Sequence, residues 1–135
     1  AVALGIKATQ SKYSVYFTTC HQLISKLNKA QKENRIDKQL QHFAQYKILI
    51  VDEIGYLPID RQGANLFFQL ISKRYGKKST IITTNMPFGA WGDVFNDNIL
   101  ASAILDRLLD RAYVVKIVGE SYRTKYLAIN KKSAG

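Results

Sequence analysis

The sequence has little cysteine and no long apolar run. Its single cysteine, Cys20, has no second cysteine with which to form an internal disulfide or a zinc site. No stretch of about 18 or more apolar residues is present, and the first residues lack the basic and apolar regions of a signal peptide. We therefore expect a cytoplasmic protein without a membrane partner, and we expect neither redox nor structural metal chemistry.

Acidic residues are also scarce. Ten Asp and Glu stand against 20 Lys and Arg, which gives a formal net charge of +10 on 135 residues. This excess favours polyanionic partners, because Lys and Arg neutralise phosphates and release their counterions. A basic composition also aids solubility, so the distribution of the charges has to decide whether nucleic acid is the partner. With 47% hydrophobic residues, the chain is large enough for one domain with a buried core.

Apolar periodicity predicts strands that alternate with helices. Strands are expected at 13–19 (YSVYFTT), 47–51 (KILIV), 79–84 (STIITT) and 113–118 (YVVKIV). A helix or helix pair with a polar break around Asn34 follows the first strand, and further helices begin after the capping residue Asp60 and near Leu100. This order predicts an α/β fold with a mainly parallel sheet flanked by helices.

Polar residues follow two of the predicted strands. Asp52 and Glu53 end the apolar run of the second strand, and Asn85 ends the third. Ligands of open α/β sheets bind at the carboxyl ends of strands, where Asp52 is placed to hold magnesium and Glu53 to polarise an attacking water. Asn85 is placed to hydrogen-bond that water or a terminal phosphate. Alternatively, the acidic pair simply leaves a buried strand for solvent and Asn85 begins a turn before Pro87; the three features together favour nucleotide hydrolysis.

The Gly-rich loop that cradles phosphates, G-x-x-x-x-G-K-S/T, is absent from the sequence. Gly76-Lys77-Lys78-Ser79 superficially resembles it, but this segment follows a helix and precedes a strand, whereas the loop must follow a strand and open a helix. Residues 1–8 (AVALGIKA) are apolar and have no capping residue, which is typical of the middle of a helix. We therefore expect the loop to belong to sequence upstream of this chain.

Four segments resemble the sequence blocks of one family: LIVDEIGYLPID (49–60), TTNMPFGAWGDVFND (83–97), ILDRLLDRA (104–112) and GESYR (119–123). In this order they are similar to the transposition helper ATPases of the IstB family, which resemble the helicase loader DnaC and, more distantly, the initiator DnaA. The resemblance implies a partial AAA+ or P-loop NTPase-type domain over residues 1–130 that begins after the Walker A motif, with a disordered tail at 131–135. The first strand of that fold would be missing, so we expect the strand at 113–118 to be poorly paired unless a partner or swap supplies it.

The resemblance also implies roles for individual residues. Asp52 and Glu53 would be the Walker B pair, with Asp52 holding Mg²⁺, and Asn85 would sense the terminal phosphate of ATP. Arg107 would be an arginine finger that reaches the nucleotide of a neighbouring subunit in a homo-oligomer, and Arg123 a second sensor of nucleotide state. Arg suits such roles because its planar fork meets phosphate oxygens with two bonds. From the residues alone, the alternative for Arg107 is a pair with a neighbouring aspartate on its own helix.

A basic row follows the first predicted strand, with one cation every three residues: Lys26, Lys29, Lys32, Arg35 and Lys38. On a continuous helix these side chains would wind slowly around one side, opposite much of the apolar face. The spacing is compatible with the nucleic-acid contact that the wider family makes in this region, although a solvated helix face has the same pattern. A second cluster has less to distinguish it: Lys73, Arg74, Lys77 and Lys78.

Three functions fit these observations. The first is an ATP- and Mg²⁺-dependent AAA+ ATPase that oligomerises on DNA and assists a transposase or loads a replicative helicase. The second is a non-enzymatic DNA-binding module, which the absent phosphate loop favours. The third is another parallel α/β phosphohydrolase, such as a RecA-like or helicase core, against which the GYLP and GESYR segments weigh.

Overall fold

The computed structural model describes residues 13–118 and 124–130. Their five strands form one sheet in the order β1-β2-β3-β5-β4. The strands are β1 (Val15–Thr19), β2 (Ile48–Ile54), β3 (Ser79–Thr84), β4 (Ala112–Val118) and β5 (Thr124–Asn130). β1, β2 and β3 run parallel, whereas β5 is antiparallel to both β3 and β4. The predicted α/β fold with a mainly parallel sheet is confirmed.

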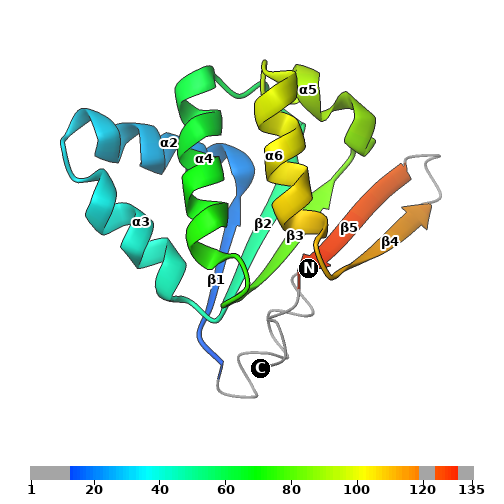
Figure 1. The fold of residues 1–135 in the computed structure, drawn as a ribbon, viewed down its shortest axis with the longest axis horizontal. Helices are drawn as coiled ribbons and strands as arrows, with labels where there is room; N and C mark the ends of the chain where they lie inside the picture. The colour runs from blue at the N-terminus through cyan, green and yellow to red at the C-terminus, as the bar shows by residue number, and fades with distance from the viewer. Residues whose placement is uncertain (1–12, 119–123, 131–135) are drawn as a thin grey trace.

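The larger helices lie over one face of this sheet (Figure 1). They are α2 (Cys20–Lys32), α3 (Ile36–Gln45), α4 (Arg61–Arg74) and α6 (Asn98–Leu109), with the short η1 (Phe88–Ala90) and α5 (Trp91–Val94) before α6. The predicted cap Asp60 accepts the backbone N–H of Gly63 at the start of α4. The apolar stripes of the helices meet Leu49, Val51 and Ile82 of the strands in one core. No helix in the described part of the chain has the length and apolar character needed to cross a lipid bilayer.

The helical region after β1 is a pair of helices, and the break falls at Asn34 as predicted. Asn34 has φ 56°, in the left-handed region that Asn tolerates better than most residues. The basic row is therefore divided between two helices instead of following one. Lys26, Lys29 and Lys32 lie on α2, Arg35 precedes the first residue of α3, and Lys38 lies on α3.

The expectation that the strand at 113–118 is poorly paired is wrong. β4 pairs with β5 along its whole length, from Ala112 opposite Asn130 to Val118 opposite Thr124. β5 in turn pairs with β3, so the β4–β5 hairpin completes the described sheet. The physical reason is that an antiparallel partner lies next in the sequence, where the entropy cost of closing the connection is small. β5 is an additional strand that the apolar patterns did not predict.

One member of the second basic cluster is not a surface residue. Arg74, near the end of α4, is only 1% exposed. Its guanidinium donates hydrogen bonds to five oxygens: the carbonyls of Phe43 (3.0 Å), Ala44 (3.4 Å), Tyr46 (2.7 Å) and Ser79 (2.6 Å), and the hydroxyl of Thr80 (3.1 Å). Arg74 therefore ties the end of α3 to α4 and to the start of β3.

Candidate functional site

Three of the predicted site residues meet at the carboxyl edge of the parallel strands. Asp52 and Glu53 lie near the end of β2, and Asn85 directly follows the neighbouring β3. Asp52 is half-buried, whereas Glu53 and Asn85 are exposed. A Cβ built on Gly55 would lie 3.3 Å from Oδ1 of Asn85, so the loop that follows Glu53 packs against this side chain. The acidic pair and the amide thus share one edge of the sheet, where α/β proteins bind their ligands.

β2 carries a bulge at the acidic pair. The pairing register between β2 and β3 shifts between Val51 and Ile54, and Glu53 has φ 66°. This left-handed conformation costs a non-glycine residue about 1–2 kcal/mol, so contacts around it must hold it in place. Bulges are frequent next to active sites, where they re-aim a side chain. The sequence predicted a strand that ends at Val51, before the acidic pair. In the structure β2 continues through Asp52 and Glu53 to Ile54.

The hydroxyl of Thr83 joins the two acidic residues across the strands. It donates a hydrogen bond to Oδ1 of Asp52 and accepts one from the backbone N–H of Glu53 at 3.0 Å. The next residue, Thr84, donates to the carbonyl of Ile54 at 2.5 Å. Two adjacent threonines of β3 therefore hold the bulge from both sides. From the sequence both were expected only as β-branched strand residues, because their hydroxyl roles depend on a cross-strand pairing that no local pattern reveals.

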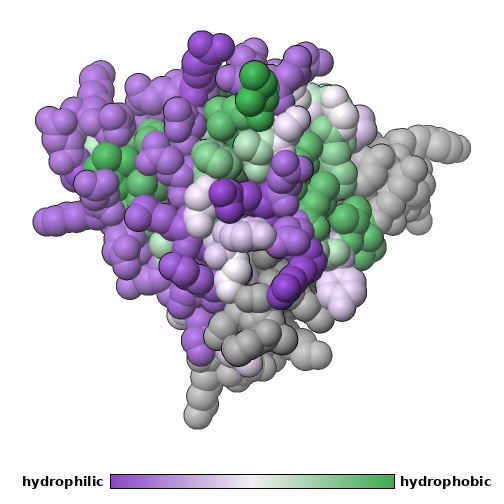
Figure 2. All heavy atoms as spheres, viewed as in Figure 1, coloured by the Kyte–Doolittle hydropathy of each residue, from purple (hydrophilic) through white to green (hydrophobic). Residues whose placement is uncertain are grey.

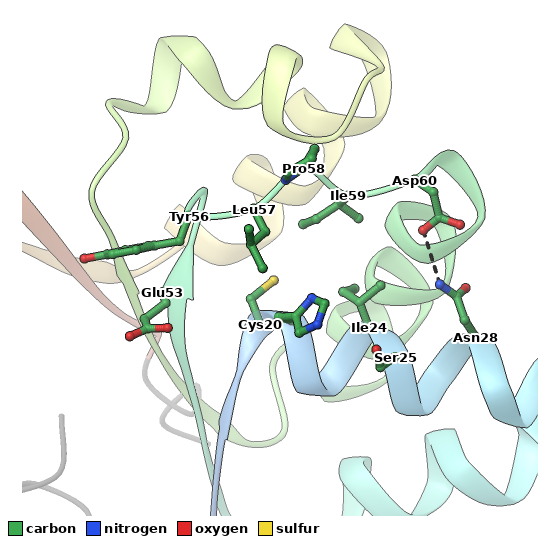
Figure 3. Close-up of a pocket in the computed structure, with 11 residues that line it drawn as sticks. Cys20, Ile24, Ser25, Asn28, Glu53, Tyr56, Leu57, Pro58, Ile59 and Asp60 are labelled. Carbon is green, nitrogen blue, oxygen red and sulfur yellow. Dashed lines mark hydrogen bonds between the residues drawn. The ribbon is translucent and has the colours of Figure 1, made fainter.

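A pocket of about 220 Å³ opens beside Glu53, between the loop after β2 and the first turns of α2 (Figure 3). His21 and Asn28 line it from α2, and the half-exposed Tyr56 lines it from the loop. Asn28 donates a hydrogen bond of 3.2 Å to Oδ1 of Asp60, the residue that caps α4. The helix that carries most of the basic row is therefore fastened to the loop that follows the acidic pair.

Asp52 is the residue best placed to hold a cation. No group of three or more His, Cys, Asp or Glu side chains within residues 13–118 and 124–130 is arranged as a metal site. Mg²⁺ needs only one or two protein carboxylates when substrate phosphates and water supply its other ligands. Asp52 is half-buried and is oriented by Thr83, so it fits that use.

Burial raises the pKa of the Cys20 thiol to about 12, which keeps it protonated and unreactive at neutral pH.

Arg107 does not join this cluster. It lies in the last turn of α6, at the end of the sheet opposite the acidic pair (Figure 1). Its guanidinium carbon lies 5.0 Å from the ring centroid of Tyr75 and 5.8 Å from that of Phe68. The Tyr75 hydroxyl donates to Asp110, and this hydrogen bond raises the pKa of Tyr75. Since β2 is about 20 Å long, Arg107 cannot serve the acidic pair of its own chain. The predicted second sensor, Arg123, lies outside the described residues.

All five members of the basic row are exposed. α2 contains no Asp or Glu, so nothing on that helix neutralises its three lysines. Lys26 donates to the Tyr16 hydroxyl at 2.8 Å, and Arg35 pairs with Glu33 at 2.9 Å. Figure 2 shows a mostly hydrophilic surface in the region of α2 and α3, with a smaller hydrophobic patch within it. This surface is cationic mainly through α2.

Comparison with known proteins identifies the family of this chain. Residues 1–130 match the family described as IstB-like ATP binding protein. The chain belongs to this IstB-like family. It is 55% identical over 125 residues to a Bacillus thuringiensis subsp. berliner protein named for ATP binding in insertion sequence IS232, covering 93% of this chain and 50% of that one. It is 48% identical over 135 residues to a Pseudomonas aeruginosa protein named in the same way for IS21, covering 100% and 49%.

The IstB-like chain spans about half the length of these relatives, and its fold recurs in the replication initiator DnaA. DnaA bound to AMPPCP and single-stranded DNA superposes with a TM-score of 0.63 at 17% identity, over 74% of this chain and 31% of that one. AMPPCP-bound DnaA from Aquifex aeolicus gives a TM-score of 0.60 at 16% identity, over 73% and 31%. The expected AAA+ type of P-loop NTPase fold is confirmed.

The bridge made by Thr83 predicts an energetic coupling with Asp52. Thr83→Val keeps the shape of the side chain but removes the hydroxyl, so we expect a loss of about 1 kcal/mol in the free energy of unfolding. Asp52→Ala removes the other partner. A double-mutant cycle by urea unfolding should give a coupling energy of about 1 kcal/mol between the two sites.

Thr83→Ser is the matched control, because it retains the hydroxyl. Asp52→Ala should therefore cost nearly the same in Thr83→Ser as in the wild type, so a cycle built on Thr83→Ser should give a coupling energy close to zero. Strict additivity of Thr83→Val and Asp52→Ala would mean that the hydroxyl does not orient the carboxylate in solution.

Proposed function

We propose that this chain is part of an ATP- and Mg²⁺-dependent AAA+ ATPase of the cytoplasm that oligomerises on DNA and assists a transposase. The observation that carries the proposal is the meeting of Asp52, Glu53 and Asn85 at the carboxyl edge of the sheet, in a family described as ATP-binding. The named relatives come from insertion sequences, which favours a transposase over a replicative helicase as the recruited partner.

In this proposal each residue of the cluster has a separate task. Asp52 holds Mg²⁺, which supplies neutralisation of phosphate charge when it is bound, and Thr83 fixes the orientation of that carboxylate. Glu53 accepts the proton of the attacking water, and Asn85 hydrogen-bonds that water or the terminal phosphate. Arg107 acts on the nucleotide of a neighbouring subunit, because it lies too far from the acidic pair of its own chain.

Two further parts of the proposal lie outside the described site. Arg123 is proposed as the second sensor of nucleotide state. The phosphate cradle must come from outside residues 13–118 and 124–130, because no Gly-rich loop follows a strand within them. The segment Gly76-Lys77-Lys78-Ser79 connects α4 to the amino end of β3, at the edge opposite Asp52, so it does not supply that cradle.

Nucleic acid is proposed to bind the exposed side of α2 and the start of α3. Lys26, Lys29 and Lys32 supply most of the unopposed positive charge there, because α2 has no acidic residue. Arg35 contributes less to the local charge, since Glu33 pairs with it, and Lys38 follows Asp37. The cationic surface therefore offers phosphate contacts that carry little base specificity.

Binding of a fluorescent ATP analogue with Mg²⁺ tests the nucleotide part of the proposal. It should be measured on the 135-residue chain and on the same chain extended at its amino end by the corresponding region of the Pseudomonas aeruginosa relative. We expect only the extended protein to bind. Within it, Glu53→Gln should still bind nucleotide but lose about 10²- to 10⁴-fold in ATP turnover, because the proton acceptor is removed.

Glu33→Gln is the matched control, since it makes the same chemical change at an exposed glutamate away from the cluster. It should leave turnover at the wild-type level. Failure of the extended protein to bind nucleotide would favour the alternative function, a non-enzymatic DNA-binding module. That module would bind DNA with an affinity that nucleotide does not change.

A further inference from the structure

A second cationic pocket, of about 450 Å³, lies at the amino ends of the parallel strands. Three lysines line it: Lys47, which precedes β2, and Lys77 and Lys78, which connect α4 to β3. Ser79 and Tyr13 complete its polar and aromatic wall. This pocket therefore lies at the edge of the sheet opposite the acidic pair, and it is separate from the candidate nucleotide site.

The lysines converge because the starts of the strands are tied together. The backbone N–H of Ser79 donates to the carbonyl of Lys47 at 3.0 Å, and the N–H of Lys47 donates to the hydroxyl of Ser14 at 2.9 Å. The backbone of all three strand starts is thus fixed around the pocket. The ligand would therefore have to order only the lysine side chains and not the backbone that carries them.

The pocket has positive charge that the described residues do not neutralise. No Asp or Glu is among its lining residues, and the ion pairs found within the described ranges involve other side chains. Three ammonium groups around one cavity repel one another, and a polyanion bound there would relieve that repulsion. Nζ of Lys47 lies 5.5 Å from the ring centroid of Tyr13, which is 50% exposed, so the pocket also offers a ring on which a base can stack.

Two tyrosine rings near α2 and near the pocket each carry a lysine. Lys26 on α2 lies 5.5 Å above the ring of Tyr16, and that ring lies 5.1 Å from the ring of Tyr46. Tyr46 immediately precedes Lys47, whose ammonium group lies over Tyr13. Alternating cations and rings are the combination that proteins use to follow a nucleic-acid strand. Lys26 and Lys47 thus each lie over a tyrosine ring, one at the proposed DNA-binding helix and one at the second pocket.

We propose that this pocket binds backbone phosphates of nucleic acid, so that the DNA contact begins on α2 and extends to the amino ends of the strands. The inference rests on the proposed DNA-binding function and adds to it a second point of contact. Lys77 and Lys78 thereby receive a phosphate-binding role that differs from the nucleotide loop which their sequence superficially resembles. A free polyphosphate shares the same chemistry, and the experiment separates the two ligands.

The affinity for a fluorescent single-stranded oligonucleotide, measured at several salt concentrations, tests the inference. The slope of log K against log salt concentration is negative. In Lys77→Ala/Lys78→Ala its magnitude should fall by about 1.5, since each lost phosphate contact removes about 0.7–0.9. The matched control is Arg61→Ala/Lys73→Ala, which removes two exposed charges outside the pocket. We expect the control to change the slope by less than about 0.5.

The possible outcomes distinguish a failure of the proposed DNA-binding function from a failure of the second pocket alone. A wild-type chain that does not bind the oligonucleotide overturns the DNA-binding function itself. A wild-type chain that binds, with Lys29→Ala/Lys32→Ala weakened but Lys77→Ala/Lys78→Ala equal to its control, overturns the second pocket alone. Pyrophosphate binding that is lost in Lys77→Ala/Lys78→Ala, with an unchanged oligonucleotide slope, would identify a small-anion site and would also overturn it.

Discussion

Arg74→Met is expected to lower the free energy of unfolding by about 3–5 kcal/mol. Met fills a similar volume but has no donor, so it would leave carbonyls of α3 and β3 buried without a partner. Total stability of a domain of this size is about 5–15 kcal/mol, so this one change removes a large part of it. Urea unfolding followed by the fluorescence of the single tryptophan, the buried Trp91, would measure the loss.

Two neighbouring substitutions distinguish the effect of the hydrogen bonds of Arg74 from that of removing any cation at the end of α4. Lys73→Met changes the adjacent, exposed residue and should alter stability by less than about 0.5 kcal/mol. Thr80→Val removes only one of the five acceptors and should cost about 1 kcal/mol. Equal denaturation midpoints for Arg74→Met and Lys73→Met would show that the buried hydrogen bonds of Arg74 add nothing to stability.

The five acceptors of Arg74 are all neutral oxygens. The carbonyls of Phe43 and Ala44 belong to the last turn of α3, where the helix dipole is negative and favours a cation. Burial lowers the pKa of Arg74 to about 10, so the guanidinium is still charged at neutral pH. The helix end thus serves in place of a carboxylate partner.

Local sequence patterns were sufficient for most of the secondary structure and for the position of the acidic pair. Apolar runs and helical spacing depend on the nearest neighbours in the chain, so the parallel strands and the cap at Asp60 could be predicted. The same reasoning placed Asp52 and Asn85 at one edge, because the carboxyl ends of neighbouring parallel strands coincide. The roles assigned to these residues stay predictions.

Features that depend on contacts between distant segments could not be predicted. The bulge at Glu53 arises from pairing with β3, and its stabilisation by Thr83 requires knowing which strands are neighbours. Arg74 and Lys73 are adjacent cations in the sequence, yet one is buried and the other exposed, because only Arg74 points toward the end of α3. The position of β5 between β3 and β4 could not be predicted for a related reason, since its pairing with β3 joins segments that are distant in the sequence.

Two inactive variants, when mixed, are expected to regain ATP turnover. In the protein extended at its amino end, Arg107→Ala should lower turnover by about 10³- to 10⁵-fold, as the loss of an arginine finger does. In the proposed interface one subunit supplies Glu53 and its neighbour supplies Arg107. Glu53→Gln therefore inactivates the subunit that binds the nucleotide, whereas Arg107→Ala inactivates its neighbour's contribution. In an equal mixture, about a quarter of the interfaces would combine an intact Glu53 with an intact Arg107, so turnover should rise to about that fraction of the wild-type value.

The position of Arg107 explains why ATP turnover should recover only when Glu53 and Arg107 come from different subunits. Arg107 is stacked on Tyr75 and Phe68 at the amino end of the strands, a full strand length from Asp52 and Glu53. A mixture of Glu53→Gln with Asp52→Ala is the matched control, because both changes fall on the same side of the interface and no pairing of subunits restores it. Recovery in the first mixture alone would locate the finger in the neighbouring subunit. Equal inactivity of both mixtures would instead leave Arg107 as a structural residue held by its two aromatic rings.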